Sequence, residues 1–399
     1  MDVTAGHSAR ALQAFNQRRV LSNFFEHGTL SRREIGALTG LSKPTVSQVL
    51  TRLEAAGIVM CTGVSTVSGP GPNAQLYELN GRVAHVAGVD MADHRVTVEV
   101  ADLVGRVVGR CELPTDQDPV SGVRQAIETA TTKAGIGLSA LSHIVVGVPA
   151  AVNPRTGALS YTARLTRWAT ADLPARLHSQ LGVGITMEND VNLAAIAEQH
   201  DGHAIGHTDF AVLWVSTGVG LALVIDGNPH RGATGAAGEI GHARLAFDTP
   251  HRSALGGEFE NLVGADAVRS LAQEHGLTGE DPTTMVQGAA NSLLWPKPAG
   301  GQPAGDQAAF LGALADRITI ALGVVAAVID PQLIVLNGDL LRAGGEQLRG
   351  LIERRLHALD VPQPTVALTG VKGNAVVGGA IHLAMRSARA TILDSGHAR

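Results

Sequence analysis

Cysteine and aromatic residues are scarce in this 399-residue chain, and its net charge is not basic. The two cysteines, Cys61 and Cys111, lie far apart, so neither a disulfide framework nor a cysteine-rich metal site is available. Aromatic residues make up 3% and glycines number 48, which suits an α/β architecture with tight turns. With a formal net charge of -5, any contact with nucleic acid must come from a local basic patch.

Targeting and membrane signals are also missing. The N-terminus has no basic region followed by an apolar run, and we expect no stretch to reach the roughly 20 apolar residues of a membrane span. These absences predict a cytoplasmic protein without a membrane partner. The length predicts two or three domains.

Residues 18–59 predict three short helices. The second begins after the N-cap candidate Ser31, with Glu34 three residues later, and the third begins after Ser42 with Pro44 in its first turn. A tight, glycine-containing turn separates these two helices. This arrangement predicts a helix-turn-helix.

The third helix has a polar face suited to DNA. Hydroxyl, amide and basic side chains cluster toward its N-terminal half, where a recognition helix enters the major groove. An ordinary solvated three-helix bundle is the alternative interpretation. The predicted DNA-binding residues, which include one arginine of the preceding helix, are Arg32, Ser42, Lys43, Thr45, Ser47, Gln48 and Arg52.

A hairpin follows the third helix. The stretch "MCTGVSTVSGPGPNAQLYELN" has a Gly/Pro-rich tip between two extended pieces, which predicts a β-hairpin wing that runs into a linker. The segment resembles the winged helix-turn-helix of ROK-family repressors (repressor, open reading frame, kinase). The wing tip of that family usually carries an arginine for the minor groove, whereas "GPNA" here has none.

The stretch "GATGAAGEIGH" combines bare backbone with two reactive side chains. Glu239 and His242 are spaced to lie on one side of a helical turn. From the residues alone, the pair could act in acid/base chemistry, hold a metal, or form a pocket wall that grips hydroxyl groups.

The rest of the chain resembles the ROK family over essentially its whole length, most specifically in "HRGATGAAGEIGH" and "ENDVNLAA". The resemblance implies an N-terminal winged helix-turn-helix domain at 1–82 and an α/β two-lobed actin-like or hexokinase-like ATPase fold at 83–399. Lobe 1 is expected at about 83–200 plus a C-terminal helix at about 376–399, and lobe 2 at about 201–375.

The resemblance also implies a sugar pocket at the lobe interface. Carboxylates and carboxamides suit a sugar, because each can bond to neighbouring hydroxyls. Arg164 stands where many members place an asparagine, and it is either a contact to an anionic sugar derivative or a surface residue. The predicted sugar-binding residues are Asn189, Asp190, Glu239, His242, Glu260 and Arg164.

The nucleotide motifs of the family are altered. Its enzymes have Asp-x-Gly-Gly-Thr at the first phosphate turn, but here Ala92 and Asp93 replace the glycines, and Asp93 puts a negative charge near a triphosphate. The second turn, "STGVG", is nearly whole, while "LNGDL" carries Asn337 and Asp339 where the family tends to have glycine. We therefore expect no kinase activity, although Asp190 matches the general base of the kinases.

Zinc is not expected either. Family members bind it through the histidine of "GEIGH" and three downstream cysteines, and the interval after His242 contains no cysteine. A non-standard site of His242, His251 and Glu258 is left open, although structural zinc sites are mostly thiolate-rich. We expect no cofactor.

Together these features predict a DNA-binding transcriptional repressor of carbohydrate-related genes that senses a sugar in a non-catalytic, kinase-like cleft. A homodimer or homotetramer would match a palindromic double-stranded operator. The alternatives are an active ATP-dependent sugar kinase that carries a DNA-binding head, and a regulator with a vestigial pocket that binds no sugar.

Overall fold

The computed structural model describes residues 3–64, 74–92, 95–114, 118–161, 173–249, 252–294 and 304–395. Contacts between Cα atoms divide the chain into two compact units. Unit 1 comprises Met1–Val146, Leu173–Thr186 and Ala380–Arg399, and unit 2 comprises Gly147–Asp172 and Met187–Gly379. The boundaries expected near residues 82, 200 and 375 stay predictions.

Unit 1 begins with the predicted winged helix-turn-helix. The head consists of α1 (Val3–His27), β1 (Leu30–Ser31), α2 (Arg32–Thr39), α3 (Lys43–Ala55), β2 (Val59–Val64) and β3 (Gln75–Leu79). The capping box is present: the Ser31 side chain accepts from the Glu34 amide, and the Glu34 carboxylate accepts from the Ser31 amide at 2.8 Å. The first helix is longer than residues 18–27. Of the wing, the tip at 65–73 lies outside the described residues.

The head has its own apolar core. The helical periodicity of α3 turns four side chains inward, and the three strands pair in the order β1-β3-β2. Tyr77 of β3 is 1% exposed, and its hydroxyl accepts a hydrogen bond from the Arg32 guanidinium at 2.5 Å. The buried core includes Val20, Leu21, Phe24, Ile35, Val46, Val49, Leu50, Leu53 and Tyr77.

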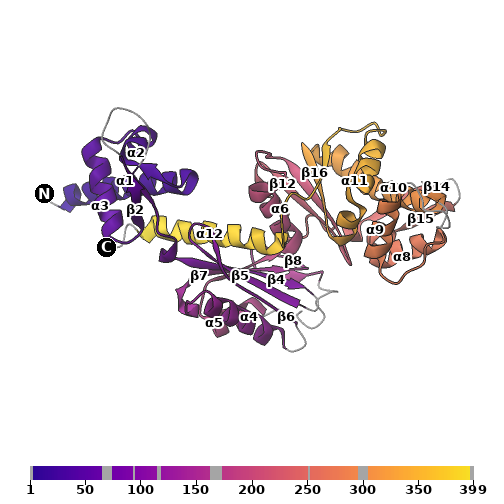
Figure 1. Ribbon diagram of the computed structural model, residues 1–399, viewed down its shortest axis with the longest axis horizontal. Coiled ribbons are helices and arrows are strands. Elements are labelled where there is room, and N and C mark those ends of the chain that lie inside the picture. The colour runs from indigo at the N-terminus through magenta and orange to yellow at the C-terminus, as the bar shows by residue number, and fades with distance from the viewer. Residues whose placement is uncertain are drawn as a thin grey trace. The chain divides into compact units, whose positions relative to one another are not determined.

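The rest of unit 1 is built on a five-stranded sheet in the order β10-β7-β4-β5-β6. After η1 (Gly81–Val83), the strands β4 (His85–Ala92), β5 (Arg95–Asp102) and β6 (Val107–Pro114) form an antiparallel meander. Then follow α4 (Pro119–Lys133), η2 (Leu138–Ala140), β7 (Leu141–Val148), α5 (Leu173–Leu181) and β10 (Ile185–Asn189). Helices α4 and α5 cover one face of this sheet (Figure 1).

Unit 2 contains a second five-stranded sheet in the order β13-β12-β11-β16-β17. Its strands are β11 (Phe210–Val215), β12 (Val219–Ile225), β13 (Asn228–Pro229), β16 (Leu333–Asn337) and β17 (Thr365–Leu368). Helices α6 (Asp190–Asp201) and α11 (Asp339–Leu356) pack against it, and short strands β8 (Ala151–Val152) and β9 (Leu159–Ser160) pair with each other.

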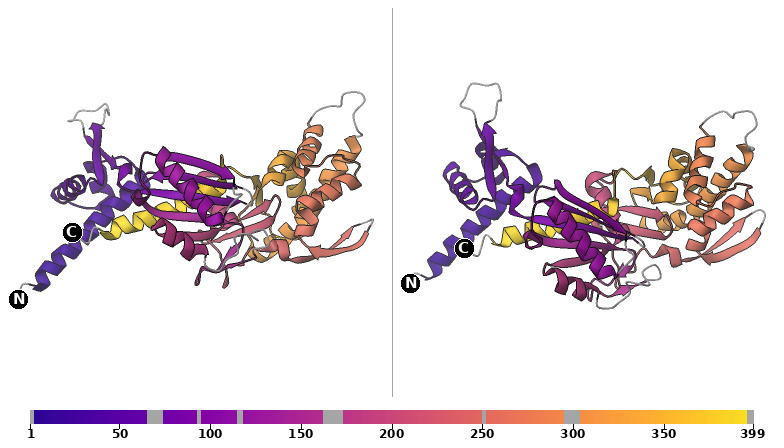
Figure 2. Two further views of the ribbon diagram at one scale, coloured as in Figure 1. Left: turned by 90° about the horizontal axis from the view of Figure 1, so that it is seen from below. Right: turned by 60° about the horizontal axis from the view of Figure 1, so that its bottom comes forward.

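A helical layer completes unit 2. It comprises α7 (Glu260–Val263), α8 (Ala265–Glu274), α9 (Pro282–Ser292) and α10 (Ala304–Ile329). The hairpin of β14 (Arg244–Thr249) and β15 (Arg252–Glu258) extends beside these helices, in salmon in Figure 2. The short 3₁₀ helix η3 (Ile240–His242) precedes the hairpin.

The expectation that no stretch is apolar enough to span a membrane needs correction. Within α10, Asp306–Ile329 is long and apolar enough to do so. Half of the apolar window is buried, and Phe310, Leu314 and Ile318 lie in the core of unit 2. Buried core helices of globular domains have the same composition, so this helix is weak evidence for a membrane span.

The C-terminal helix α12 (Ala375–Ser395) contributes to both units and is one continuous element (Figure 1, yellow). In unit 2, Ala375 packs with Ala194 and Ala197 of α6. In unit 1, Ile392 and Leu393 pack against the core of the winged head. The Arg389 guanidinium also lies 4.9 Å from the centre of the Phe25 ring in α1.

Candidate functional site

The glycines of "GATGAAGEIGH" let a loop run very close to neighbouring backbone. Gly235 and Gly238 have φ angles of 90° and 91°, which favour glycine. A Cβ on Gly235 would lie 2.1 Å from the Val152 carbonyl oxygen, and one on Gly238 would lie 1.8 Å from that of Leu221. The bare backbone therefore fixes the path of the chain just before Glu239.

Three of the predicted ligand residues gather at the end of this loop. Glu239 directly precedes η3, and burial raises the pKa of its carboxyl group. The nearby Glu260 carboxylate, at the start of α7, also raises this pKa, and His242 opposes the shift. Two acids and an imidazole thus interact electrostatically in a partly buried place.

His242 is less buried than Glu239. Its side chain is 42% exposed, its Nδ1 lies 3.7 Å from the Glu258 Oε2, and its ring centre lies 5.1 Å from that of Tyr161. Among the described residues, no group of three or more His, Cys, Asp or Glu is arranged to hold a metal ion. His251, the third member of the alternative metal site, lies outside those residues.

The Asn189–Asp190 pair begins helix α6. The Asn189 Oδ1 accepts hydrogen bonds from the amides of Val191 and Asn192 at 2.9 and 3.1 Å, so this residue is an N-cap. Its Nδ2 donates to the Ala150 carbonyl oxygen at 3.2 Å and has a second hydrogen that can donate to a ligand. Asp190, whose Oδ1 accepts from the Val191 amide at 2.8 Å, occupies the first helical position.

We call Asn189, Asp190, Glu239, His242 and Glu260 the polar wall. Arg164, the sixth predicted sugar contact, lies outside the described residues. Two residues that the sequence reasoning missed tie the two parts of the wall together. Glu188 precedes Asn189 and pairs with Arg231, at the start of the glycine loop. Glu188 begins "ENDVNLAA", and Arg231 is the second residue of "HRGATGAAGEIGH". An acid and a base without an assigned role in these motifs could therefore have indicated the pair.

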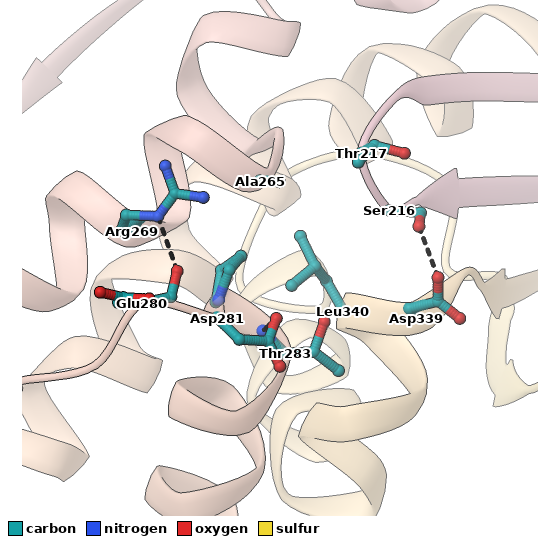
Figure 3. A pocket seen from close by; sticks show the side chains of 10 residues that line it. Ser216, Thr217, Ala265, Arg269, Glu280, Asp281, Thr283, Asp339 and Leu340 are labelled. Atoms are coloured by element: carbon teal, nitrogen blue, oxygen red, sulfur yellow. Dashed lines mark hydrogen bonds between the residues drawn. The ribbon is translucent and has the colours of Figure 1, made fainter. Parts of the chain in front are cut away.

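A separate pocket of about 390 Å³ lies where "STGVG" and "LNGDL" meet, and we call it the acid-lined pocket (Figure 3). Ser216 and Thr217 come from the first motif, and Asp339 and Leu340 from the second. The remaining lining residues, from α8, α9 and the loop between them, are Ala265, Arg269, Glu280, Asp281, Pro282 and Thr283.

The polar groups of the acid-lined pocket largely bond to protein atoms. The Ser216 hydroxyl donates to Asp339 Oδ2 at 2.7 Å, and the Arg269 Nε donates to the Glu280 carbonyl oxygen at 2.9 Å (Figure 3). Asp281 caps α9. Asp339 sits in the first turn of α11, so a carboxylate of the chain lies near the helix end that would attract a phosphate.

The first phosphate turn is described only at its edges. Ala92 ends β4 and pairs with Arg95 of β5, so the two strands are joined by the residues Asp93 and His94. Those two residues lie outside the described part of the chain. The effect of Asp93 on a triphosphate therefore stays a prediction.

The predicted DNA contacts lie on the surface of the head. Lys43, Gln48 and Arg52 are exposed along α3, and Thr45 and Ser47 are half-buried. The Ser42 side chain caps the helix by accepting from the Thr45 amide at 3.4 Å. Arg32 is exposed as well, but its guanidinium lies over the Tyr77 ring and bonds to the hydroxyl.

These features define a class of protein: a winged helix-turn-helix head joined to a body with a sugar-kinase-like fold. The sequence profile of the ROK family matches residues 86–387, and that of the MarR family matches residues 14–60. The chain belongs to the ROK family.

Relatives of this chain include repressors and kinases. The xylose repressor of Caldicellulosiruptor bescii is 23% identical over 381 residues, which cover 93% of this chain and 95% of that protein. A crystal structure of a ROK family transcriptional regulator, a homolog of the E. coli MLC protein, has a TM-score of 0.75 at 17% identity and covers 97% of this chain and 99% of its own. A crystal structure of a ROK glucokinase from Streptomyces griseus, in complex with glucose and AMPPNP, has a TM-score of 0.60 at 20% identity. The match covers 76% of this chain and 100% of the glucokinase chain.

Proposed function

We propose that the protein is a sugar-responsive, DNA-binding transcriptional repressor of carbohydrate-related genes. It acts in the cytoplasm as a homodimer or homotetramer on a palindromic operator. The relative named a xylose repressor, which aligns along 93% of this chain, supports this role and makes a pentose the first effector to test.

The single observation that carries the proposal is that one chain has both an exposed polar face on α3 and a partly buried acid, Glu239, beside a second acid and a histidine. On α3, Lys43, Gln48 and Arg52 are exposed while the opposite face fills the head core. Long basic and amide side chains in such a place contact phosphates and base edges. Arg32 is proposed to orient the wing strand as well as to contact DNA, because it bonds to Tyr77.

The polar wall supplies the groups that a sugar needs. The carboxylates of Asp190, Glu239 and Glu260 accept hydrogen bonds from sugar hydroxyls, and His242 and the Asn189 amide add donors. A partly buried carboxylate such as Glu239 bonds more strongly to a ligand than an exposed one, because it competes with less water.

Catalysis is not part of the proposal. Kinases need phosphate-binding turns that stabilise negative charge, whereas Glu280, Asp281 and Asp339 line the acid-lined pocket. The sequence predicts one more acid, Asp93, at the first phosphate turn. Asp190 is then proposed to be a sugar acceptor instead of a general base.

Regulation follows from differential affinity. A sugar changes DNA binding only if it binds one arrangement of the protein more tightly than another. Helix α12 is the proposed connection, because Ala375 packs with α6, which begins at Asn189 and Asp190, and Leu393 packs in the head core. Sugar bound at the polar wall would thereby favour one arrangement of the head over another.

Fluorescence anisotropy with duplexes from the promoter of the encoding gene tests the proposal. We expect specific binding that weakens with salt and that D-xylose or D-glucose releases. Gln48→Ala should weaken specific binding by about 1–3 kcal/mol. Lys43→Ala should weaken binding to all duplexes alike and lower the slope of log affinity against log salt concentration by about one. Equal affinity for specific and random duplexes would contradict the proposal.

An active sugar kinase with a DNA-binding head is the rival, and Asp190 favours it. A coupled ADP-release assay with D-glucose and D-xylose distinguishes the two. We expect no turnover, and turnover that Asp190→Asn abolishes would establish the kinase.

A further inference from the structure

Next to Asn189 lies an ion pair between a buried carboxylate and a half-buried arginine. Glu188 in β10 is 3% exposed, and the Arg231 Nε and Nη2 both lie close to its Oε2, at 2.7 and 2.6 Å. The other oxygen, Oε1, accepts hydrogen bonds from Asn192 Nδ2 at 3.0 Å and from the Asn189 amide at 3.1 Å. Both oxygens of the carboxylate are therefore engaged by protein donors and do not serve as sugar acceptors.

The pair joins the two parts of the polar wall. On the Glu188 side lies the start of α6, where its Oε1 bonds to the Asn189 amide and to the Asn192 side chain. On the Arg231 side lies the glycine loop, because the Arg231 carbonyl oxygen accepts from the Ala237 amide at 3.3 Å. From Ala237 the chain continues directly through Gly238 to Glu239.

The fixed points of the loop make this connection stiff. The Gly238 carbonyl oxygen accepts from the Leu221 amide at 3.0 Å, and the close approach of Gly235 to the Val152 carbonyl leaves no room there for a side chain. Arg231 fixes the remaining end, since its Nη1 also donates to the Pro229 carbonyl oxygen at 3.4 Å. Loss of the guanidinium frees the end that faces α6.

A buried ion pair is poor evidence for stability alone, because an apolar pair of similar size often stabilises a fold as well or better. What the pair adds is a fixed geometry between the start of α6 and the 231–239 segment, which both carry acids of the polar wall. Here that geometry is the placement of Asp190 and Asn189 relative to Glu239.

We propose that the Glu188–Arg231 pair is a positioning clamp that sets the affinity of the polar wall for a sugar by fixing the 231–239 segment against the start of α6. Neither residue contacts the sugar. The inference rests on the proposed function for its ligand, but the fixing of the loop can be measured without any ligand.

The test compares three variants of the full-length protein: Arg231→Met, Glu188→Met with Arg231→Met, and the control Arg349→Met. Arg349 in α11 is a matched arginine of the same unit, because it also pairs with carboxylates, those of Glu346 at 2.6 Å and Glu353 at 2.8 Å. The measurements are the Tm, the Kd for D-xylose and D-glucose by calorimetry, and amide hydrogen exchange of peptides that cover 231–242.

We expect Arg231→Met to weaken sugar binding by about tenfold or more and to speed exchange in 231–242. The double variant should recover Tm, since it leaves no unpaired buried charge, but not sugar affinity or slow exchange. Arg349→Met should change sugar affinity by less than about twofold.

Recovery of both Tm and sugar affinity in the double variant would overturn the clamp and leave a purely structural ion pair. Unchanged exchange of 231–242 in Arg231→Met would overturn it as well, whatever the sugar data show. If the wild-type protein binds neither sugar but the loop still loosens in both Arg231 variants, the fixing of the loop by the pair stands, while sugar sensing and the effect of the pair on sugar affinity both fail. The two failures are thus distinguishable.

Discussion

The polar wall and the acid-lined pocket both belong to unit 2, and both are rich in carboxylates, but the surroundings of these carboxylates differ. In the acid-lined pocket, Asp339 accepts from Ser216 and Asp281 caps α9. In the polar wall, Glu239 lies partly buried beside a second acid, while Glu188 and Arg231 brace the backbone from behind. A partly buried acid on a braced backbone suits ligand binding, whereas the bonds of Asp339 and Asp281 to the protein's own groups leave those two acids less suited to it.

The acid-lined pocket keeps the placement of two family motifs but not their charge. "STGVG" and "LNGDL" meet in space as their family counterparts would imply, and a pocket is present there. What differs is the charge: Asp339 stands at the N-terminal turn of α11, where a helix end would otherwise attract phosphate. The two motifs thus still form a pocket, but an acid stands at the helix end beside it.

The largest effect should come from breaking the backbone of the polar wall. In Gly238→Ala, the new Cβ would lie 1.8 Å from the Leu221 carbonyl oxygen at a φ of 91°. We expect a loss of at least about 2 kcal/mol of stability and no measurable sugar binding. Chemical denaturation and calorimetry check this.

Gly288→Ala in α9 is the matched control, because nothing lies within 4 Å of its Cβ position. It should stabilise the helix by about 0.5–1 kcal/mol and leave sugar binding unchanged. If both alanine variants behave alike, the close backbone approach at Gly238 has no special role.

Next in size is the loss of a single acceptor. Glu239→Gln keeps the shape of the wall but removes the charge, so sugar affinity should fall by about 10- to 150-fold, which corresponds to about 1.5–3 kcal/mol for a hydrogen bond to a charged group. Operator binding without sugar should be unaffected. Calorimetry and anisotropy on one preparation report both, and a twofold or smaller change in sugar Kd would remove Glu239 from the site.

A smaller effect should appear in the pH dependence of stability. Burial raises the pKa of Glu239 in the folded protein, so its ionised form carries a cost above that pKa that the unfolded chain lacks. As pH falls through the raised pKa, the carboxyl group is protonated and the cost disappears. Glu239→Gln should therefore have the higher Tm at about pH 8, by a few degrees at most, and the difference should shrink toward about pH 4.3. A difference that grows in acid has the wrong sign for a burial effect.

The smallest effect should come from the acid-lined pocket. Asp339→Ala removes the acceptor of the Ser216 hydrogen bond but touches nothing in the polar wall, so sugar affinity should change by less than about twofold. ATP should produce no shift in Tm in the wild-type protein. A clear rise in Tm with ATP that depends on Ser216 and Asp339 would show that the acid-lined pocket binds nucleotide, as a kinase requires.

Local signals in the sequence predict much of the fold. Ser31 with Glu34, Ser42 with Pro44, and the apolar spacing of α3 act within a few residues, and the structure has the head helices that they indicate. The part of α1 before residue 18 was not predicted, because the helix has only a weak apolar face. The apolar length of α10 was misjudged, since a buried core helix tolerates scattered Asp and Arg residues along one side.

The site was harder to predict than the fold. The motifs single out Glu239, His242 and Asp190, but a polar residue at a helix start can be a cap or a ligand, and Asn189 is in fact a cap. The Glu188–Arg231 pair joins residues 43 positions apart, and only the folded backbone brings them together. Long-range pairing of this kind has no local signature.

Operator release by sugar, measured in parallel for the wild type and Glu239→Gln, tests the central claim most directly. On a duplex from the promoter of the encoding gene, we expect D-xylose or D-glucose to release the wild-type protein, and the variant to remain bound at the same sugar concentration. Release that is equally strong in the variant would contradict a sensing site at the polar wall, and wild-type binding that no sugar alters would contradict sugar-responsive repression itself.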